Sequence, residues 1–351
     1  MLSPSQKQDK IVRSTDLDAL SCRWNCVQKG YFEDVNIDKI INSYSKYLQF
    51  CEGYTNLSAG RTYKSVFDRK LPIINRGTYL RTKSISDIIG KFINDNEKCQ
   101  IVSMGVGSDT RVFKLINPNI NYIELDFEET TRIKKLTIIN DSELSKAVNY
   151  SGLGATVADR SQFQTLDPNL HTDNYHLIGL DLRRLSDSNI VSEFLDSKRP
   201  TLVLSECVLC YLNPGENEKI LKFWTDSISN LSLLIYEPIS LNDSFGQQMR
   251  ENLGRRGINL LTFNHFPTLK SKFDFLKSLN FQDINVTDIA SIGGYSGDEL
   301  SWISAEESKR IDKLDLIDEI EEIKLLLLHY CLVYGGIGKH TNLSKKWKLS
   351  T

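Results

Sequence analysis

The segment Ile101-Val-Ser-Met-Gly-Val-Gly-Ser-Asp-Thr110 constrains the fold of this chain more than any other. An apolar strand leads directly into two glycines, Gly105 and Gly107, which are separated by one residue. A second strand ends in Asp126, about 20 residues after the turn. A glycine-rich turn lets the backbone approach a ligand, and an acid at the tip of the next strand can accept hydrogen bonds from both ribose hydroxyls. The pattern predicts a site for an adenosine-type cofactor, although a tight turn without a ligand has the same pattern.

The third glycine position narrows the class of cofactor. A dinucleotide fingerprint has a third glycine three residues after the second, where a helix packs closely against the pyrophosphate. Thr110 occupies that position here. S-adenosylmethionine has no pyrophosphate and does not require that glycine. Thr110, together with the lack of an evident histidine, tyrosine or lysine for hydride transfer, disfavours a dehydrogenase.

Composition and charge limit the kinds of protein and of binding partner that this chain is compatible with. The chain has 351 residues, of which 40% are hydrophobic and 25% charged, as is ordinary for a globular protein. A net charge of −2 and the lack of a basic stripe with interleaved aromatics give no support for nucleic-acid binding. No apolar run is long enough to span a bilayer, and Met1 to Lys10 lack the apolar core of a signal peptide. We expect a cytoplasmic protein without a nucleic-acid or membrane partner.

The seven cysteines are irregularly spaced in a chain large enough to fold without disulfides. We interpret them as reduced thiols, which fits a cytoplasmic location. Cys207 and Cys210 form one Cys-x-x-Cys pair, but no second pair or histidine pair accompanies it, as a zinc site would require. Both lie at the end of an apolar strand, where cysteine packs as a small hydrophobic residue. We therefore predict no metal site.

Strand-like runs alternate with helical patterns along the chain. The early runs are continuously apolar, which is typical of parallel strands covered on both faces. Apolar residues at helical spacing precede the first strand, from Ile85 to Ile93, and a second such pattern separates the last two strands, from Ile311 to Ile323. The alternation predicts an α/β fold with a seven-stranded, doubly wound parallel sheet that binds ligands at the carboxyl ends of its strands. The expected strands are Gln100–Met104, Asn121–Leu125, His176–Leu180, Thr201–Ser205, Ser232–Tyr236, Gln282–Ile289 and Tyr330–Tyr334.

Several segments exceed what such a fold requires. We expect residues 1–83 to form an N-terminal helical extension or lid, followed by the main domain over residues 84–334. That domain carries insertions at 139–172 and 239–275, and long insertions at the ligand edge are usually functional. Residues 335–351 remain as a C-terminal tail whose basic end looks frayed.

Acids stand at the ends of three consecutive predicted strands, at Asp126, Asp181 and Glu206. The carboxyl ends of parallel strands meet at one edge of a sheet, so we expect these side chains to converge. Asp181, followed by the apolar Leu182, suits the amino group and ring of adenine. The alternative is that Asp181 and Glu206 each cap the helix that follows.

Two arginines are candidates for holding carboxylates. Arg81 ends the run Asn75-Arg-Gly-Thr-Tyr-Leu-Arg81, and Arg183 lies two residues after Asp181. The planar guanidinium group can form paired hydrogen bonds with a carboxylate. A surface ion pair is the alternative for each arginine.

Taken together, these motifs resemble the leucine carboxyl methyltransferases, which methylate the C-terminal leucine of the protein phosphatase 2A catalytic subunit. The resemblance runs from about Thr15 to Tyr334, and the glycine motif is its least specific part. The matched motifs are Asp16–Arg23 with Gly30-Tyr31, Pro72–Arg81, Val102–Asp109, Asp181–Arg183, Ser205–Tyr211, Asp243–Gln247 and His329–Cys331.

The resemblance implies a Rossmann-like class I methyltransferase fold with S-adenosylmethionine as cofactor. Arg23 stands where the family has a lysine, which keeps the positive charge in a different shape. We expect Arg81 to hold the carboxylate of the cofactor with Arg23 assisting, and Arg183 and Tyr211 to orient the carboxylate of the substrate. The other expected cofactor residues are Gly105, Gly107, Asp126, Asp181, Leu182 and Glu206.

Two other functions remain as alternatives. Related carboxyl methyltransferases act on a modified transfer RNA base, but they carry a long C-terminal kelch-repeat region, and these 351 residues contain no such repeat. The other alternative is a non-catalytic module that clamps the phosphatase tail, which the full set of cofactor residues disfavours. We expect a monomeric enzyme whose partner is the C-terminal tail of the phosphatase catalytic subunit.

Overall fold

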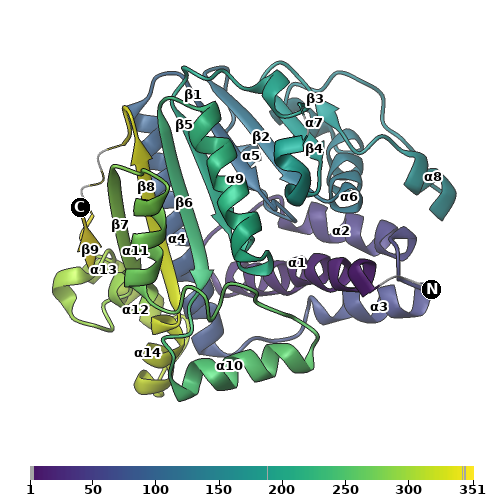
Figure 1. Ribbon diagram of the computed structural model, residues 1–351. Helices are drawn as coiled ribbons and strands as arrows, with labels where there is room; N and C mark the ends of the chain where they lie inside the picture. Colours follow the sequence, from purple (N-terminus) through teal and green to yellow (C-terminus); the bar gives the residue numbers. More distant parts are fainter. Residues whose placement is uncertain (1–3, 188, 342, 344) are drawn as a thin grey trace. The chain divides into compact units, whose positions relative to one another are not determined.

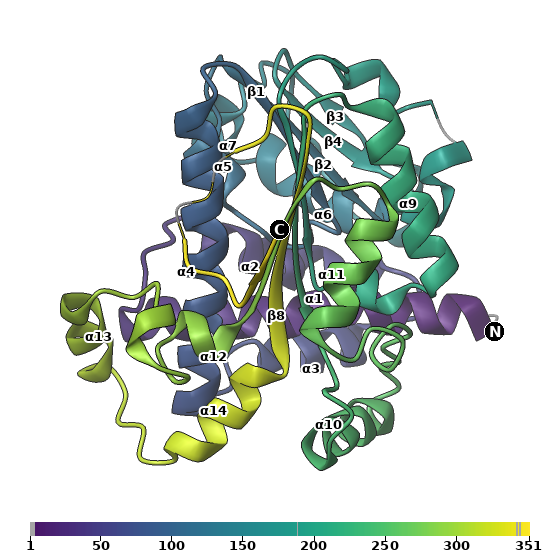
Figure 2. The same ribbon diagram turned by 60° about the vertical axis from the view of Figure 1, so that its left-hand side comes forward.

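The computed structural model describes residues 4–187, 189–341, 343 and 345–351. Within it the chain divides into two compact units. Figures 1 and 2 label their helices and strands. The first comprises residues 1–28, 32–70 and 102–194, and the second residues 29–31, 71–101 and 195–351. The domain boundaries expected from the sequence, after residues 83 and 334, stay a prediction.

The first unit combines the N-terminal helices with one part of the sheet, in the strand order β3-β4-β2-β1. β2 (Ile120–Asp126) pairs in parallel with β4 (Tyr175–Gly179), and the short β3 (Leu170–His171) is antiparallel to β4. β1 (Cys99–Met104) begins among the residues of the second unit. The helices are α1 (Pro4–Lys29), α2 (Ile37–Tyr47), α3 (Asn56–Ser65), α5 (Val112–Leu115), α6 (Glu128–Ile139), α7 (Ser142–Ala147) and α8 (Arg160–Thr165).

The second unit has the strand order β5-β6-β8-β7-β9. β5 (Thr201–Glu206) and β6 (Leu231–Pro238) are parallel, whereas β8 (Tyr330–Ile337) is antiparallel to β6 and to β7 (Asp283–Asp288). β9 (Leu349–Ser350) is antiparallel to β7. The helices are α4 (Pro72–Asp95), α9 (Pro214–Ser227), α10 (Ser244–Arg255), α11 (Leu269–Ser278), α12 (Ile289–Ile292), α13 (Ala305–Asp312) and α14 (Ile320–Leu328).

Helices cover both faces of the strands in the second unit. Figure 2 shows α4 on one side of β8 and α9 and α11 on the other. α9 illustrates how the sequence builds such a layer, because Asn213 caps its first turn, Pro214 takes the first helical position and Trp224 is buried. Burial of a large apolar side chain contributes on the order of 2–3 kcal/mol. Among the described helices, none is long and apolar enough to cross a membrane.

The predicted strands are all present, and the prediction of a Rossmann-like α/β fold is confirmed. The expectation of a wholly parallel sheet is wrong, because β8 lies antiparallel between β6 and β7. The sheet also contains β3 and β9, which were not predicted. Each has only two residues, too few to give a recognisable apolar run.

The prediction of a single helix between the last two long strands is wrong, because residues 313–319 separate α13 from α14. In this stretch the buried carboxylate of Asp315 accepts hydrogen bonds from Lys29 Nζ at 2.7 Å and Asn75 Nδ2 at 3.0 Å. Leu316, which follows, is 82% exposed. The apolar spacing here does not mark one face of a helix, because the polar contacts of Asp315 decide which residue points inward.

The basic end of the chain is ordered against the second unit rather than frayed. β9 extends the edge of the sheet at β7. Trp302 Nε1 donates a hydrogen bond to the Lys346 carbonyl at 2.9 Å, and the rings of Trp302 and Trp347 meet edge to face with centroids 5.0 Å apart. Trp347 therefore holds this charged segment against Trp302, and the pattern of charges in the sequence did not predict that contact.

Candidate functional site

The turn after β1 is shaped by two glycines with left-handed backbone. Gly105 has φ of 59° and Gly107 has φ of 51°, a conformation that residues with a side chain rarely adopt. Between them, the Val106 N–H donates a hydrogen bond to the Leu125 carbonyl at 3.2 Å. The turn therefore brings successive backbone N–H groups to the carboxyl end of β2.

Asp126 ends β2 and contacts this turn. Its Oδ2 accepts a hydrogen bond from the Gly107 N–H at 2.7 Å, and its Oδ1 accepts one from the Phe127 N–H at 2.7 Å. The side chain is buried, and burial raises the pKa of Asp126 to about 6. The Gly107 N–H partly offsets this shift, and the neighbouring Asp16 carboxylate adds to it. A buried carboxyl group with a raised pKa is typical of functional sites.

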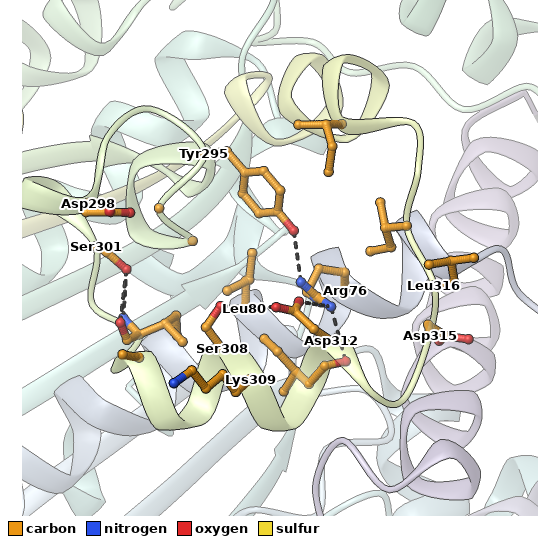
Figure 3. A pocket seen from close by; sticks show the side chains of 17 residues that line it. Arg76, Leu80, Tyr295, Asp298, Ser301, Ser308, Lys309, Asp312, Asp315 and Leu316 are labelled. Carbon is orange, nitrogen blue, oxygen red and sulfur yellow. Dashed lines mark hydrogen bonds and ion pairs between the residues drawn. The ribbon is translucent and has the colours of Figure 1, made fainter.

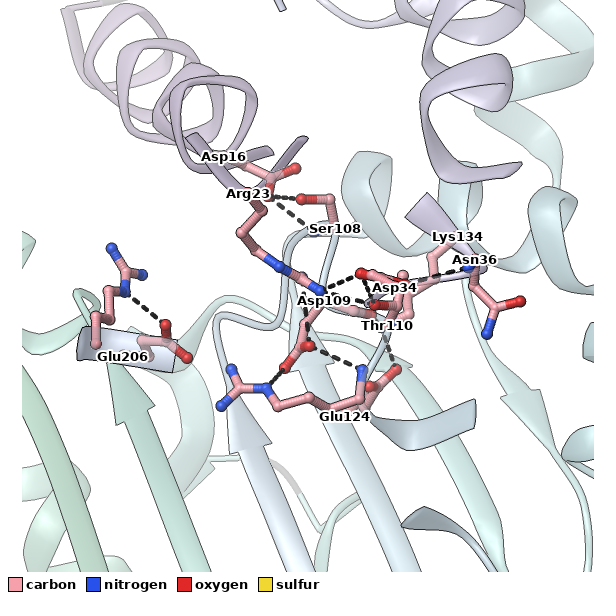
Figure 4. A network of polar contacts seen from close by, with 12 residues as sticks. Asp16, Arg23, Asp34, Asn36, Ser108, Asp109, Thr110, Glu124, Lys134 and Glu206 are labelled. Carbon is pink, nitrogen blue, oxygen red and sulfur yellow. Dashed lines mark hydrogen bonds and ion pairs between the residues drawn. The ribbon is translucent and has the colours of Figure 1, made fainter. Parts of the chain in front are cut away.

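A second carboxylate, Asp16 of α1, contacts the same turn (Figure 4). Its Oδ1 accepts hydrogen bonds from the Ser108 N–H at 2.8 Å and the Ser108 hydroxyl at 2.7 Å. The Tyr44 hydroxyl donates to Asp16 Oδ2. A Cβ atom on Gly107 would lie 2.3 Å from Asp16 Oδ1, so this approach requires glycine. Sequence reasoning did not select Asp16 as a site residue, and the only signal was its place in a matched motif.

Arg23 lies about two turns further along α1 and contacts the end of the glycine turn. Its Nη2 donates hydrogen bonds to Asp34 Oδ2 at 2.5 Å and to Thr110 Oγ1 at 2.7 Å, as Figure 4 shows. Its Nη1 lies 3.5 Å from Asp109 Oδ1. Burial would raise the pKa of Asp109, but neighbouring cations led by Arg111 outweigh burial and lower it to about 2. Whether Arg23 also meets the carboxylate of the cofactor stays a prediction.

Asp181 and Leu182 follow β4 in the same unit. The Leu180 N–H donates a hydrogen bond to the Asp126 carbonyl at 2.7 Å, which joins the ends of β2 and β4. Leu182 begins a short 3₁₀ helix and is buried. Two predicted cofactor residues, Asp126 and Asp181, therefore lie at the ends of neighbouring parallel strands.

Arg183, predicted to orient the carboxylate of the substrate, is paired with acids of its own unit. Its Nε lies 2.9 Å from both carboxylate oxygens of Asp181, and its Nη2 lies 3.0 Å from both oxygens of Asp9. The hydrogen bonds that Arg183 donates to Asp181 raise the pKa of Arg183 above its usual range. A substrate carboxylate would compete with these acids, so the predicted role requires an exchange of partners.

Arg81 and Glu206 form an ion pair in the second unit, between α4 and the end of β5. Arg81 Nε donates a hydrogen bond to Glu206 Oε1 at 2.6 Å, and the guanidinium lies 4.9 Å from the centroid of the Tyr236 ring. Burial alone would lower the pKa of Arg81, but Glu206 raises it well above its usual range. The side chain thus keeps the positive charge that the predicted role at a carboxylate needs.

The loop after β5 holds Tyr211, the last predicted residue, which is half-buried. The Leu261 N–H donates a hydrogen bond to the Cys210 carbonyl at 2.7 Å, so the insertion at 239–275 contacts this loop. Burial raises the pKa of Cys207 to about 11, so that thiol is protonated at neutral pH. In the part of the chain that the structure describes, no group of three or more histidine, cysteine or acidic residues could hold a metal ion.

A cavity of about 760 Å³ in the second unit was not anticipated from the sequence (Figure 3). Arg76 lines it and is 5% exposed. Its Nη1 donates a hydrogen bond to the Tyr295 hydroxyl at 3.0 Å and its Nη2 to Asp312 Oδ1 at 2.9 Å. These contacts tie α4 to α13, so Arg76 holds the unit together, although it belongs to the same sequence run as Arg81.

The fold and these residues together define the class of protein. A glycine turn after β1, an acid at the end of β2 and another after β4 have the arrangement that Rossmann-like α/β proteins show at their ligand-binding edge. Comparison with known proteins then gives the family.

The sequence profile of the leucine carboxyl methyltransferase family matches residues 11–225. The chain is 50% identical to leucine carboxyl methyltransferase 1 of Debaryomyces hansenii, with 99% of each chain covered. It is 44% identical to leucine carboxyl methyltransferase 1 of Candida albicans, with 99% of this chain and 97% of the relative covered. The chain belongs to the leucine carboxyl methyltransferase family, and the prediction of an enzyme that methylates a leucine carboxyl group is confirmed.

The chain also matches solved structures at low sequence identity. A DUF574 family protein from Streptomyces avermitilis has a TM-score of 0.47 and 9% identity, with 85% of this chain and 96% of that chain covered. Magnesium protoporphyrin IX methyltransferase from Synechocystis has a TM-score of 0.40 and 10% identity, with 83% of this chain and 98% of that chain covered.

Proposed function

We propose that this protein transfers a methyl group from S-adenosylmethionine to the α-carboxylate of the C-terminal leucine of the protein phosphatase 2A catalytic subunit. The product is a leucine methyl ester. The observation that carries the proposal is the similarity to leucine carboxyl methyltransferases along nearly the full length of the chain. The phosphatase as the source of the leucine follows from the resemblance of the sequence motifs.

S-adenosylmethionine is the methyl donor, and the chemistry of the residues present fits it. Asp126 offers a buried acceptor for ribose hydroxyls, and the half-buried Asp181 carboxylate offers an acceptor for the amino group of adenine. When bound, the cofactor supplies an electrophilic methyl group on a sulfonium centre. The residues that would hold it are Arg23, Arg81, Gly105, Gly107, Asp126, Asp181, Leu182 and Glu206.

The substrate carboxylate needs orientation rather than activation. A C-terminal carboxyl group has a reference pKa of about 3.5 and is ionised at neutral pH. The reaction therefore needs no general base and no covalent intermediate. Arg183 and Tyr211 orient the carboxylate, and partial removal of water from the two reacting charges favours the transfer. Arg183 changes partner from its own acids to the substrate in this step.

The enzyme acts as a monomer in the cytoplasm, and its partner is the folded phosphatase. Reducing conditions in the cytoplasm keep thiols unpaired. This fits Cys99, Cys210 and Cys331, which are buried free thiols in the structure.

Labelled methyl transfer tests the proposal. Purified enzyme and methyl-labelled cofactor are incubated with phosphatase that has its terminal leucine and with phosphatase that lacks it. We expect label only on the intact protein, and we expect mild alkali to release it, because esters hydrolyse and methylamines do not. Label that survives alkali, or label on transfer RNA in a parallel reaction, would contradict the proposal. Tight binding without any transfer would instead favour the non-catalytic module.

A further inference from the structure

The N–H groups of the glycine turn are occupied by carboxylates from this chain. The Gly107 N–H donates to Asp126, and the next N–H, of Ser108, donates to Asp16 together with the Ser108 hydroxyl. In nucleotide-binding proteins, successive N–H groups of such a turn form a concavity that binds phosphate. In this turn two negative charges take the place that an anion would occupy.

Two cations of α1 near the turn, Arg13 and Arg23, pair with residues other than Asp16 and Asp126. Arg23 donates to Asp34 and Thr110, and Arg13 lies 3.1 Å from Glu129. Among the residues that the structure describes, the hydrogen-bond donors to Asp16 are the neutral groups of Ser108 and Tyr44. The Gly107–Ser108 part of the turn therefore carries two carboxylates, whereas nucleotide-binding turns leave such N–H groups open to phosphate.

We propose that Asp16 is a specificity-determining residue that makes the cofactor site reject adenosine compounds bearing phosphate groups. The proposal rests on the proposed function, in which this turn holds S-adenosylmethionine. That cofactor has no phosphate, its sulfonium centre is positive, and its one carboxylate is balanced by its own ammonium group and assigned to Arg81, so its adenosine part brings no negative charge to the two carboxylates. Adenosine mono- and diphosphates share its adenosine part, but they would bring negative charge to the turn, where Asp16 and Asp126 repel it and already accept from the Ser108 and Gly107 N–H groups.

Uncharged variants separate the charge of Asp16 from its structural role. In Asp16→Asn the amide oxygen can still accept from Ser108, and the amide nitrogen can donate to the Tyr44 hydroxyl, so the contacts persist without the charge. Asp16→Ser is a second uncharged variant with a smaller acceptor. Ser108→Ala is the matched control, because it removes one hydrogen bond to Asp16 and keeps the charge.

Competition binding tests the proposal. Adenosine, adenosine monophosphate and adenosine diphosphate are each added as competitors of labelled S-adenosylmethionine, to wild-type enzyme and to the three variants. The readout is the ratio of the affinity for adenosine to that for the diphosphate. We expect this ratio to fall about tenfold or more in Asp16→Asn and Asp16→Ser, because a repulsive charge is removed. It should stay at the wild-type value in Ser108→Ala.

The outcomes distinguish this proposal from the proposed function. Variants that bind S-adenosylmethionine and keep the wild-type ratio would show that Asp16 only shapes the turn, and the specificity role would be rejected. Wild-type enzyme that fails to bind S-adenosylmethionine, or from which adenosine does not displace it, would overturn the proposed cofactor site instead. If one uncharged variant does not fold, the other gives the same comparison.

Discussion

The surroundings of Asp126 have opposing effects on its pKa. Backbone N–H groups stabilise its ionised form, whereas burial and the nearby Asp16 favour its protonated form, and its pKa rises to about 6. An ionised carboxylate can accept hydrogen bonds through both oxygens, but a protonated one must use one oxygen as a donor. The hydrogen bonds expected from the ribose of the cofactor therefore require a proton to leave.

We predict that affinity for S-adenosylmethionine rises as pH increases through the pKa of Asp126, with a midpoint near 6. Calorimetry at several pH values would measure this in wild type and in Asp126→Asn. The variant should bind the cofactor more weakly by about 1–3 kcal/mol and should lose the pH dependence. A midpoint that persists in the variant would belong to another group.

The same raised pKa affects folding with the opposite sign. The folded protein binds the Asp126 proton more tightly than the unfolded chain, whose carboxyl groups have a pKa near 3.8. The stability that this group contributes is therefore present below pH 4 and is lost as pH rises towards 6. Unfolding without cofactor should show a smaller loss over this range in Asp126→Asn than in wild type.

Arg81 should be required for cofactor binding in a way that lysine cannot replace. Lysine lacks the planar fork and would lose contact with the face of Tyr236 as well as the geometry of the Glu206 pair. We expect Arg81→Lys to weaken cofactor affinity by about tenfold or more. Arg76→Lys, in the same helix, should lower thermal stability and leave the affinity of the folded enzyme unchanged. Equal affinities in wild type and Arg81→Lys would make Arg81 structural.

Sequence reasoning reached some of these residues and missed another for a clear reason. Asp126 and Asp181 end apolar strands, and the carboxyl ends of parallel strands are where ligands bind, so their positions follow from the pattern. Asp16 lies 92 residues before its partner Ser108. Nothing local marks its role, because only the packing of α1 brings it to the glycine turn.

The start of α10 depends on the end of another helix, α14. Asp243 caps α10 by accepting a hydrogen bond from the Gly246 N–H at 2.8 Å. Its Oδ1 also lies 2.9 Å from Nε2 of the buried His329, whose ring packs against Phe245 with centroids 4.6 Å apart. One carboxylate therefore both begins α10 and anchors the insertion that contains it.

We predict that Asp243→Ala lowers the free energy of unfolding by about 1–2 kcal/mol, because the cap and the His329 contact are both lost. Asp274→Ala is the control, since its exposed pair with Lys270 on α11 contributes about 0.5 kcal/mol or less. Burial would raise the pKa of Asp243, but the Gly246 N–H and His329 outweigh it and lower the pKa. The contribution of Asp243 should therefore be present above the ordinary carboxyl pKa and lost as pH falls below it. Similar thermal unfolding of both variants would contradict the anchoring role.

The strands could be predicted because burial on both faces leaves a continuous apolar run. The direction of each strand could not be predicted, because the apolar run of β8 is the same for a parallel and an antiparallel strand. Its antiparallel pairing depends on the path of the chain through α12 to α14. The prediction of a helix across residues 313–319 was wrong because Asp315 forms hydrogen bonds with Lys29 and Asn75, which lie far away in the sequence. The spacing of apolar residues indicates where a helix is favoured, but tertiary contacts decide where it ends.

The last residues of the chain complete the second unit. They add β9 to the sheet and place Trp347 against Trp302. We predict that Trp347→Ala lowers the free energy of unfolding by about 1–3 kcal/mol through lost aromatic packing. Lys346→Ala should have little effect, because Lys346 contributes its backbone carbonyl to the contact and its side chain is exposed. Chemical denaturation would measure both, and equal midpoints would show that the tail adds no stability.

The final prediction concerns how the enzyme would select the proposed substrate, the C-terminus of the phosphatase catalytic subunit, among many C-termini. A terminal leucine offers one carboxylate and one small apolar side chain, so a short tail makes few contacts. Binding energy from a surface remote from the chemistry can supply what the tail lacks. We assign this recognition to the segments 1–83 and 239–275, the second of which contacts the loop that carries Tyr211. We expect kcat/KM for an isolated tail peptide to be about a hundredfold or more below that for the folded phosphatase. A peptide amidated at its C-terminus, as a matched control, should not react at all. Equal kcat/KM for peptide and phosphatase would show that recognition ends at the tail.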